Sequence, residues 1–265
     1  MIVHKKKKDL LFQIANYLIF IVVSLICILP FVHMLAVSFS SSTAVSGGEV
    51  GLIPIGFNTQ SYTFALSDGK FLRALMISIV RVVLGVGLNL ILMCLTAYPL
   101  SRTKNELKGR NVYMIFFVIT MFINGGLIPT YLVIVKLGLI NSIWALILPF
   151  GVSVYNMIIL MNFMKTIPIE IEESARIDGA SPFLILIKII LPLMKPALAT
   201  VGLFCLVWHW NDWFHGIVYL GNPKDYPLQS YLQTLLNSFD QILRNSGGDY
   251  QELLAKVNVR TGRAS

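Results

Sequence analysis

A dense group of charged residues between two apolar segments constrains this fold more than any other feature of the sequence. Residues 167–196 hold three glutamates, an arginine and an aspartate in their first half, whereas residues 142–164 and 197–211 contain no Asp, Glu, Lys or Arg. A charged side chain is costly inside the hydrocarbon core of a bilayer. The charged segment is therefore predicted to be a loop at a membrane surface, and its neighbours are predicted to be membrane spans.

The first half of this segment predicts a short helix that ends in a sharp turn. Pro168 suits the first helical position, because its missing N–H would be unsatisfied there in any case. The three glutamates follow within about a turn, where the positive end of the helix dipole favours carboxylates. Gly179 can adopt the left-handed conformation that ends a helix.

The second half predicts another short helix. Ser181 and Pro182 supply its N-cap and its first residue. Pro192 and Pro196 are expected to break the chain again before the next span. We name residues 167–196 the elbow, since two helical arms meet there at a glycine.

Composition places the chain in the same class. Hydrophobic residues make up 56% of the sequence and charged residues 13%, which is about half the charged share of a soluble domain. An ordinary soluble protein is excluded, and an all-α polytopic membrane protein is indicated. The net charge of +8 comes from basic residues placed as membrane topology requires, so it does not indicate a nucleic-acid partner. Cys27, Cys94 and Cys205 lie in apolar segments and are predicted to be buried apolar side chains.

Five apolar segments are predicted to span the membrane. They are residues 10–36, 72–100, 112–135, 142–164 and 197–220, all approximate. Lys5 to Lys8 precede the first segment, which is too long for a signal peptide, and residues 101–111 hold four basic residues against one acidic residue. Because basic loops stay in the cytoplasm, the N-terminus, residues 101–111 and the elbow are predicted to be cytoplasmic. Residues 37–70 and 221–265 are then predicted to be external.

Polar and small residues inside the predicted spans suggest how the helices pack. Arg73 and Arg81 lie near the outer end of the second span, where both are expected to snorkel to the surface. Gly85 and Gly87 offer a surface for close helix approach. Residues 124–129, which begin with Asn124, interrupt the third span. Two interpretations stay open for this break: it lines a passage, or it is a kink beside a loop.

The fifth predicted span carries an unusual set of side chains in its second half. The set is Trp208, His209, Trp210, Asn211, Asp212 and Trp213. Trp208, Asn211 and Asp212 share one helical face. An indole stacks on the C–H face of a sugar while Asn and Asp satisfy its hydroxyls, so these three residues and Asn124 are candidates to line a translocation pathway. The alternative is an interfacial aromatic belt with hydrogen bonds between helices.

The elbow resembles the EAA loop, a signature of the membrane subunits of bacterial binding-protein-dependent ABC importers. The matching positions are Glu173, Ser174, Ala175, Gly179, Ile189, Leu191 and Pro192, with Ser174 standing where the family has alanine. Residues 97–102, 175–180 and 208–213 are similar to the maltose-type carbohydrate branch, and especially to the second of its two membrane subunits. Residues 125–131 resemble permeases for plant-type oligosaccharides.

This resemblance implies a type I ABC importer permease fold that forms half of the pathway for a sugar or oligosaccharide. It implies a second permease, two copies of a cytoplasmic ATPase and an extracytoplasmic solute-binding protein as partners, in the bacterial cell membrane. The sequence holds no phosphate-cradling Gly-rich loop and no catalytic arrangement at useful spacing. The chain is therefore not predicted to be an enzyme. ATP and Mg are expected in the partner ATPase, with no cofactor or metal in this chain.

The resemblance also implies that the elbow seats in a groove of the ATPase. The coupling residues are then Glu173, Ser174, Ala175, Asp178, Gly179, Ala180, Leu191 and Pro192. Glu173 is expected to bond to the ATPase or within the elbow, Ala175 and Ala180 to allow close approach, and Gly179 to fix the angle between the arms. Maltose-type permeases have six core spans, so a sixth, C-terminal span is expected to be missing here. Their loop corresponding to residues 221–265 inserts toward the solute-binding protein, and their partner permease supplies most sugar contacts.

Three other functions remain open from the sequence. The first is an ABC permease for a non-sugar solute such as an amino acid or peptide. The second is an ion-coupled secondary transporter with Asp212 as proton carrier, although such proteins usually hold several intramembrane ionisable groups. The third is a membrane scaffold or receptor without transport activity, which the spacing of the elbow disfavours.

Overall fold

The computed structural model describes residues 7–67, 69–103 and 106–245, and these residues form helices and connecting segments without a strand. The chain divides into two compact units, residues 1–69 with 242–265 and residues 70–241. The basic Lys5, Lys6 and Lys104 and the predicted external residues 246–265 lie outside the described residues.

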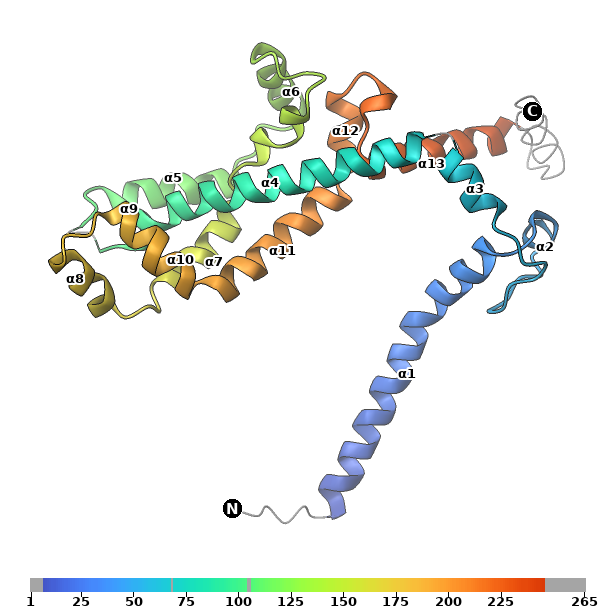
Figure 1. Ribbon diagram of the computed structural model, residues 1–265, viewed down its shortest axis with the longest axis horizontal. Helices are drawn as coiled ribbons and strands as arrows, with labels where there is room; N and C mark the ends of the chain where they lie inside the picture. The colour runs from blue at the N-terminus through green and yellow to red at the C-terminus, as the bar shows by residue number, and fades with distance from the viewer. Residues whose placement is uncertain (1–6, 68, 104–105, 246–265) are drawn as a thin grey trace. The chain divides into compact units, whose positions relative to one another are not determined.

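The first unit is built on α1 (Lys7–Ser38), which is followed by α2 (Ser42–Ser46) and α3 (Gln60–Ser67) (Figure 1). Large apolar side chains project from all sides of α1 and are exposed within this chain, which is typical of a helix surrounded by lipid or by other membrane helices. Residues Phe12–Ser38 are long and apolar enough to cross a membrane. The predicted first span therefore coincides with α1, whereas the prediction that Cys27 is buried is wrong within this chain.

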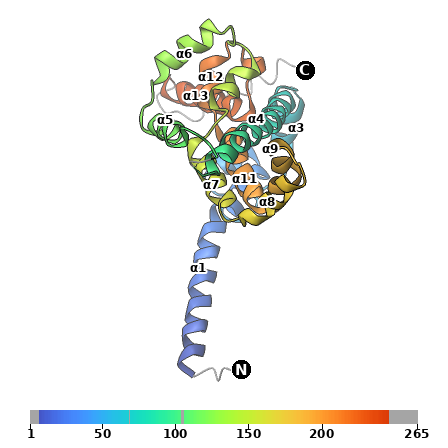
Figure 2. The same cartoon turned by 90° about the vertical axis from the view of Figure 1, so that its left-hand side faces the viewer.

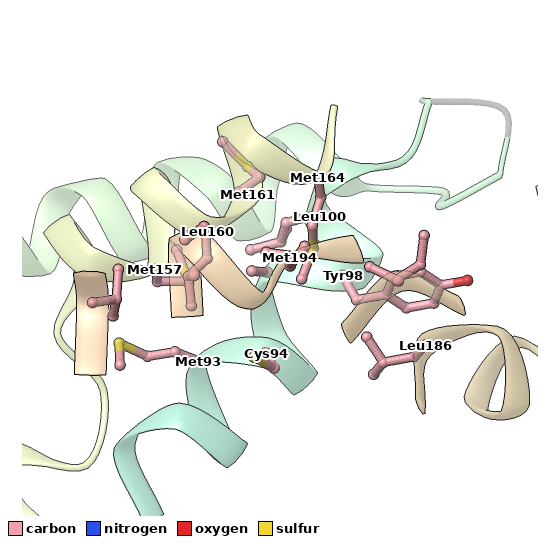
Figure 3. Packing of buried hydrophobic residues seen from close by; sticks show 14 of the residues in the cluster. Met93, Cys94, Tyr98, Leu100, Met157, Leu160, Met161, Met164, Leu186 and Met194 are labelled. Carbon is pink, nitrogen blue, oxygen red and sulfur yellow. The ribbon is translucent and has the colours of Figure 1, made fainter. Parts of the chain in front are cut away.

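The second unit is a helical bundle centred on α4 (Lys70–Ser101). This helix packs along α7 (Val154–Met164) and α11 (Lys195–Asn211), and α5 (Arg110–Phe122) lies beside α4 and α7 (Figures 1 and 2). Five methionines lie in the core between the helices and are labelled in Figure 3: Met93, Met157, Met161, Met164 and Met194. Their flexible thioethers fill irregular gaps between helices, so the bundle is packed tightly around α4.

Sharp bends divide several of the predicted spans. The third predicted span consists of α5 and α6 (Leu127–Lys136), which meet at 115°. The fourth consists of η1 (Ile143–Leu146), η2 (Leu148–Phe150) and α7, with a bend of 51°. Two of the described helices are long and apolar enough to cross a membrane on their own. Three further pairs of helices would do so if each bent pair formed one span, which gives up to five spans among the described residues.

The fifth predicted span is not one continuous helix. α11 ends at Asn211, because Asp212 adopts an extended conformation, and the chain resumes as α12 (Phe214–Tyr219). The carboxylate of Asp212 accepts a hydrogen bond from the backbone N–H of His215 at 3.4 Å and so satisfies one free donor at the start of α12. The predicted fifth span, residues 197–220, is therefore interrupted at Asp212.

The two ends of α4 meet different parts of the chain. Near its beginning, Ser78 accepts a hydrogen bond from the backbone N–H of Leu228 at 2.7 Å, and Arg73 pairs with Asp225 at 2.9 Å. These partners belong to η4 (Pro223–Asp225) and to the start of α13 (Leu228–Asn245). At the far end of α4, the Leu100 carbonyl accepts a hydrogen bond from Arg110 at 2.7 Å, and the Tyr98 hydroxyl donates one to Glu172 of the elbow at 3.4 Å. The described residues of 101–111 and the elbow therefore lie at one end of the bundle, as their common prediction as cytoplasmic loops requires.

Of the two glycines predicted to allow close helix approach, one does so. A Cβ atom added to Gly85 would lie 2.5–2.8 Å from three ring atoms of His209 on α11, whereas a Cβ on Gly87 would meet nothing within 4 Å. His209 cannot easily move aside, because its Nε2 is 2.8 Å from the side-chain oxygen of Asn89. Gly85 therefore sets the distance between α4 and α11.

We expect Gly85→Ala to destabilise the bundle by about 1–3 kcal/mol, the usual cost of overpacking, and Gly87→Ala to be neutral or slightly stabilising. The measurement is thermal unfolding of the purified chain or its complex in detergent. Equal melting temperatures for the two variants would contradict the contact between Gly85 and His209.

Candidate functional site

The elbow has the two helical arms that its sequence predicts. The first arm is α8 (Ile169–Ile177), and the chain turns at Gly179, whose φ is +82°. The second arm starts at α9 (Pro182–Ile185), where the Ser181 hydroxyl accepts a hydrogen bond from the backbone N–H of Leu184 at 3.3 Å. The left-handed turn and the N-cap are therefore confirmed. Pro168 lies one position earlier than predicted, directly before the first helical residue.

The second arm continues past Pro192, contrary to the predicted break. It runs through a π-helical turn, η3 (Leu186–Ile190), into α10 (Leu191–Leu193), and bends by 84° into α11 after Met194. A proline in an α-helix clashes with the carbonyl four residues earlier. The wider π turn just before Pro192 changes that geometry, so the helix accommodates the proline without ending.

Glu172 ties the elbow to the end of α4. Its carboxylate pairs with Arg102 at 2.5 Å and accepts a hydrogen bond from the Tyr98 hydroxyl at 3.4 Å, and its side chain is 2% exposed. The Arg102 guanidinium also lies over the ring of Tyr98, 4.3 Å from its centroid. Tyr98 of α4, Arg102 just after it and Glu172 of α8 thus hold one another in a buried cluster. Sequence reasoning missed Glu172 and Arg102, because three glutamates stand close together and nothing in their spacing shows which one faces inward.

A second ion pair lies next to this cluster. Arg176 on α8 contacts Glu106 at 2.7 Å, and Glu106 accepts a hydrogen bond from the backbone N–H of Thr103 at 3.2 Å. Partial burial favours a higher pKa for Glu106, but the bonds from Thr103 and Arg176 outweigh it and hold its pKa below the ordinary value. The hydrogen bond to Glu106 raises the pKa of Arg176. The pair therefore stays charged at neutral pH and fixes α8 against Glu106, which is bonded to Thr103.

The predicted coupling residues divide between two faces of the elbow. Glu173, Ser174, Asp178, Gly179 and Pro192 are exposed. Ala175, Ala180 and Leu191 instead pack against the core of this chain. The close approach that Ala175 and Ala180 allow is thus to the chain itself, and Glu173 makes no ion pair within the described residues.

Apolar side chains stand beside the exposed coupling residues. Ile177 is 87% exposed and Phe183 61%, and Ile171 and Leu184 are also exposed. An exposed apolar surface of this kind is typical of a protein-binding site. The elbow is therefore held against the bundle by ion pairs and exposes apolar side chains on its outer face.

We expect Glu172→Gln to lower the stability of the elbow by about 1–3 kcal/mol, because it leaves the buried guanidinium of Arg102 without its counter-charge. Glu173→Gln, at the neighbouring exposed position, should change stability by less than about 0.5 kcal/mol. Hydrogen exchange over residues 169–190 in the detergent-purified protein measures the difference. Equal exchange rates in the two variants would show that Glu172 does not anchor the elbow.

A second group of polar residues lies inside the bundle. Arg81 on α4 is fully buried, pairs with the carboxylate of Asp212 and donates to the Asp212 carbonyl at 3.0 Å. The same carboxylate is 2.9 Å from Nδ1 of His215. Arg81 therefore does not snorkel to the surface as predicted. Its charge is instead neutralised where α11 breaks, which lets an arginine remain inside the bundle.

His209 and Asn89 form a second polar pair between α11 and α4. Nε2 of His209 donates to the side-chain oxygen of Asn89, and the Asn89 amide donates to the carbonyls of Phe150 and Gly151 at 2.6 and 2.9 Å. These bonds link α4, α11 and the junction of η2 with α7. They satisfy backbone carbonyls that the bend before α7 leaves free.

A cavity of about 410 Å³ opens beside this polar group. Its lining consists of Asn89, Pro149, Phe150, Val152, Ser153, Asn156, Phe204, Cys205 and Trp208. Of the four residues predicted to line a pathway, Trp208 alone is in this lining. The Asn124 side chain accepts a hydrogen bond from the backbone N–H of Gly126, the exposed Asn211 donates to the carbonyl of Val207, and Asp212 is held by Arg81 and His215. The residues from η2 and α7 were missed, because their nearness to Trp208 depends on the bend in the chain.

We expect Arg81→Met and Asp212→Asn each to destabilise the protein by about 3–5 kcal/mol, because each leaves a buried charge without its partner. The double variant should lose less than the sum of the two, since no buried charge remains. Thermal unfolding in detergent gives the three differences. The exposed pair Arg73 and Asp225, substituted in the same way, should cost less than about 1 kcal/mol. Additive losses for Arg81 and Asp212 would contradict their direct pairing.

Comparisons with known proteins agree on one family. A family model described as "Binding-protein-dependent transport system inner membrane component" matches residues 12–245. The polygalacturonan/rhamnogalacturonan transport system permease protein YtcP of Bacillus subtilis is 40% identical over 86% of this chain and 79% of its own length. Protein LplC of the same organism is 39% identical over 87% of this chain and 77% of its own.

A solved structure shares the fold. The crystal structure of a bacterial ABC transporter involved in the import of the acidic polysaccharide alginate contains a chain that is 32% identical to this one. The two superpose with a TM-score of 0.81, over 91% of this chain and 87% of that one. The sequence likeness and the shared arrangement of helices therefore cover nearly the same part of the chain.

Proposed function

Since the chain belongs to the family of binding-protein-dependent transport system inner membrane components, we propose that it forms half of the translocation pathway of an ATP-driven importer. The family is a membrane component of ABC importers rather than a catalytic subunit, and its members are integral to the cell membrane. Two copies of a cytoplasmic ATPase bind ATP and Mg, a second permease completes the pathway, and a solute-binding protein delivers the substrate from outside. The N-terminus and the elbow face the cytoplasm.

The geometry of the elbow carries this proposal. A loop that transmits force must be rigid on the side of its own subunit and complementary to its partner on the other side. Glu172 and Arg176 supply the first property through their buried and half-buried ion pairs. Exposed Ile177 and Phe183 supply the second, because they can enter an apolar groove of the ATPase. Glu173, Ser174 and Asp178 surround them as polar contacts.

We assign a sugar or oligosaccharide as substrate. The printed names of relatives include transport of polygalacturonan or rhamnogalacturonan and of arabinooligosaccharides, the latter for AraQ of Bacillus subtilis, which is 27% identical to this chain. One relative, UgpE of Rhizobium meliloti, is instead named for sn-glycerol-3-phosphate and is 28% identical. The relative with the highest of these identities is named for a carbohydrate polymer, which favours this substrate class over amino acids or peptides.

We expect Gly179→Val to uncouple the transporter. A β-branched residue at φ +82° is strained, so the chain must rotate there and move Ile177 away from the ATPase. In proteoliposomes that hold the complete transporter, uptake should fall at least tenfold and the solute-binding protein should no longer stimulate ATP hydrolysis. Gly48→Val is the matched control, because Gly48 has φ +67° and also lies in open space, but outside the elbow.

Two results would contradict this assignment. If Gly179→Val transported at the normal rate, the elbow would not be the coupling element. If uptake by the unaltered transporter survived depletion of ATP and collapsed with the proton gradient, the chain would act as a secondary transporter.

A further inference from the structure

The cavity beside Trp208 combines aromatic faces with a few polar groups that are free to bind. Trp208 is 40% exposed, and its ring is held 4.7 Å from that of Phe150. Ser153 and Asn156 come from the start of α7 and are half-buried. At about 410 Å³, the cavity falls within the range of small-molecule sites, roughly 300–1,000 Å³.

The polar side chains of the lining differ in how many of their hydrogen-bonding atoms already have a partner. The amide of Asn89 is saturated by His209 and by two backbone carbonyls. The amide nitrogen of Asn156 contacts only the thiol of Cys205, at 3.7 Å, and its side-chain oxygen has no bonding partner among the described residues. The Ser153 hydroxyl accepts a weak bond from the Asn156 backbone at 3.5 Å and keeps its own proton free. Asn156 and Ser153 therefore offer one donor and one acceptor group each to a molecule in the cavity.

The lining also carries no charged side chain. Arg81 lies just outside the lining, with its guanidinium carbon 5.9 Å from the centre of the Trp208 ring, and Asp212 already neutralises it. A carboxylate brought into this cavity would lose its hydration without gaining a counter-charge. A neutral, hydroxyl-rich ring would lose far less, because an amide and a hydroxyl can replace its water.

We propose that this cavity is a subsite for one neutral sugar ring of the transported molecule. The C–H face of the ring stacks on the indole of Trp208, and two of its hydroxyls bond to Asn156 and Ser153. Phe150 fixes the angle of the indole, and Asn89 fixes the backbone that carries Phe150, so these two are positioning residues. Carboxylates of an acidic polymer must then be bound elsewhere in the transporter. This inference rests on the proposed sugar transport and adds a location and a charge preference to it.

The test uses the complete transporter in nanodiscs, without the solute-binding protein, and two probes of equal length. Arabinotriose is neutral and trigalacturonate is acidic, and equilibrium dialysis measures the binding of each. Arabinotriose should bind at least tenfold more tightly than trigalacturonate. Asn156→Leu, close in shape but without hydrogen bonds, should weaken arabinotriose binding at least tenfold. Trp208→Leu should do the same, whereas Trp208→Phe, which retains an aromatic face, should recover part of the loss.

Asn211→Leu is the matched control, because this exposed amide on α11 bonds to its own helix and does not line the cavity. It should bind arabinotriose within twofold of the unaltered transporter. Binding is compared only between variants whose melting temperatures match that of the unaltered transporter. If Trp208→Leu does not fold, Asn156→Leu alone tests the cavity. Unchanged binding in Asn156→Leu, absence of arabinotriose binding, or equal binding of trigalacturonate would overturn the subsite.

ATP-driven uptake of the two probes, measured with the solute-binding protein present, separates this inference from the proposed function. If the unaltered transporter imports a probe while the cavity variants bind as before, the subsite is refuted and sugar transport stands. If it imports neither probe nor any oligosaccharide that the solute-binding protein delivers, the proposed function itself fails.

Discussion

The cost of placing charges and unpaired backbone groups in hydrocarbon governs the arrangement of this chain. Arg81 can be fully buried because Asp212 faces it, and Asp212 can break α11 because its side chain bonds to Arg81, His215 and the backbone of α12. Asn89 in turn satisfies the carbonyls that the bend before α7 exposes. The break at Asp212 and the bend before α7 are therefore each stabilised by a polar side chain that bonds to the exposed groups. The cavity beside Trp208 lies where these two segments meet.

The elbow obeys the same rule at the end of α4. Its inward face places one glutamate against a buried arginine, and its outward face keeps the charges and apolar side chains that a partner can contact. Two ion pairs attach α8 to the chain that follows α4, one from Glu172 to Arg102 and one from Arg176 to Glu106. The family signature thus identifies a surface, and the ion pairs behind that surface attach it to the helical bundle.

The sequence predicts the parts of this structure that depend on local chemistry. The turn at Gly179, the cap at Ser181, the break at residues 124–126 and the close contact at Gly85 follow from residue type and spacing. The predictions for Arg81 and Pro192 are wrong, and the break in the fifth span was not predicted, for a common reason: each depends on a partner distant in sequence or on a helix geometry other than α. Arg81 and Asp212 are 131 residues apart, and no local pattern links them. The lining of the cavity was missed because Asn156 and Trp208 come together only after the chain bends.

The π-helical turn at Leu186–Ile190 has a consequence for how the elbow and α11 are aligned. A π turn holds one residue more than the corresponding α-helical turn, and each residue of an α-helix rotates the chain by about 100°. The extra residue therefore sets the rotation of the elbow about the helix axis relative to α11, the helix that carries Trp208. A deletion of one residue there would rotate the elbow relative to α11 by about 100° while leaving the residues of its outer face unchanged. Length in this stretch is thus as strictly specified as residue identity.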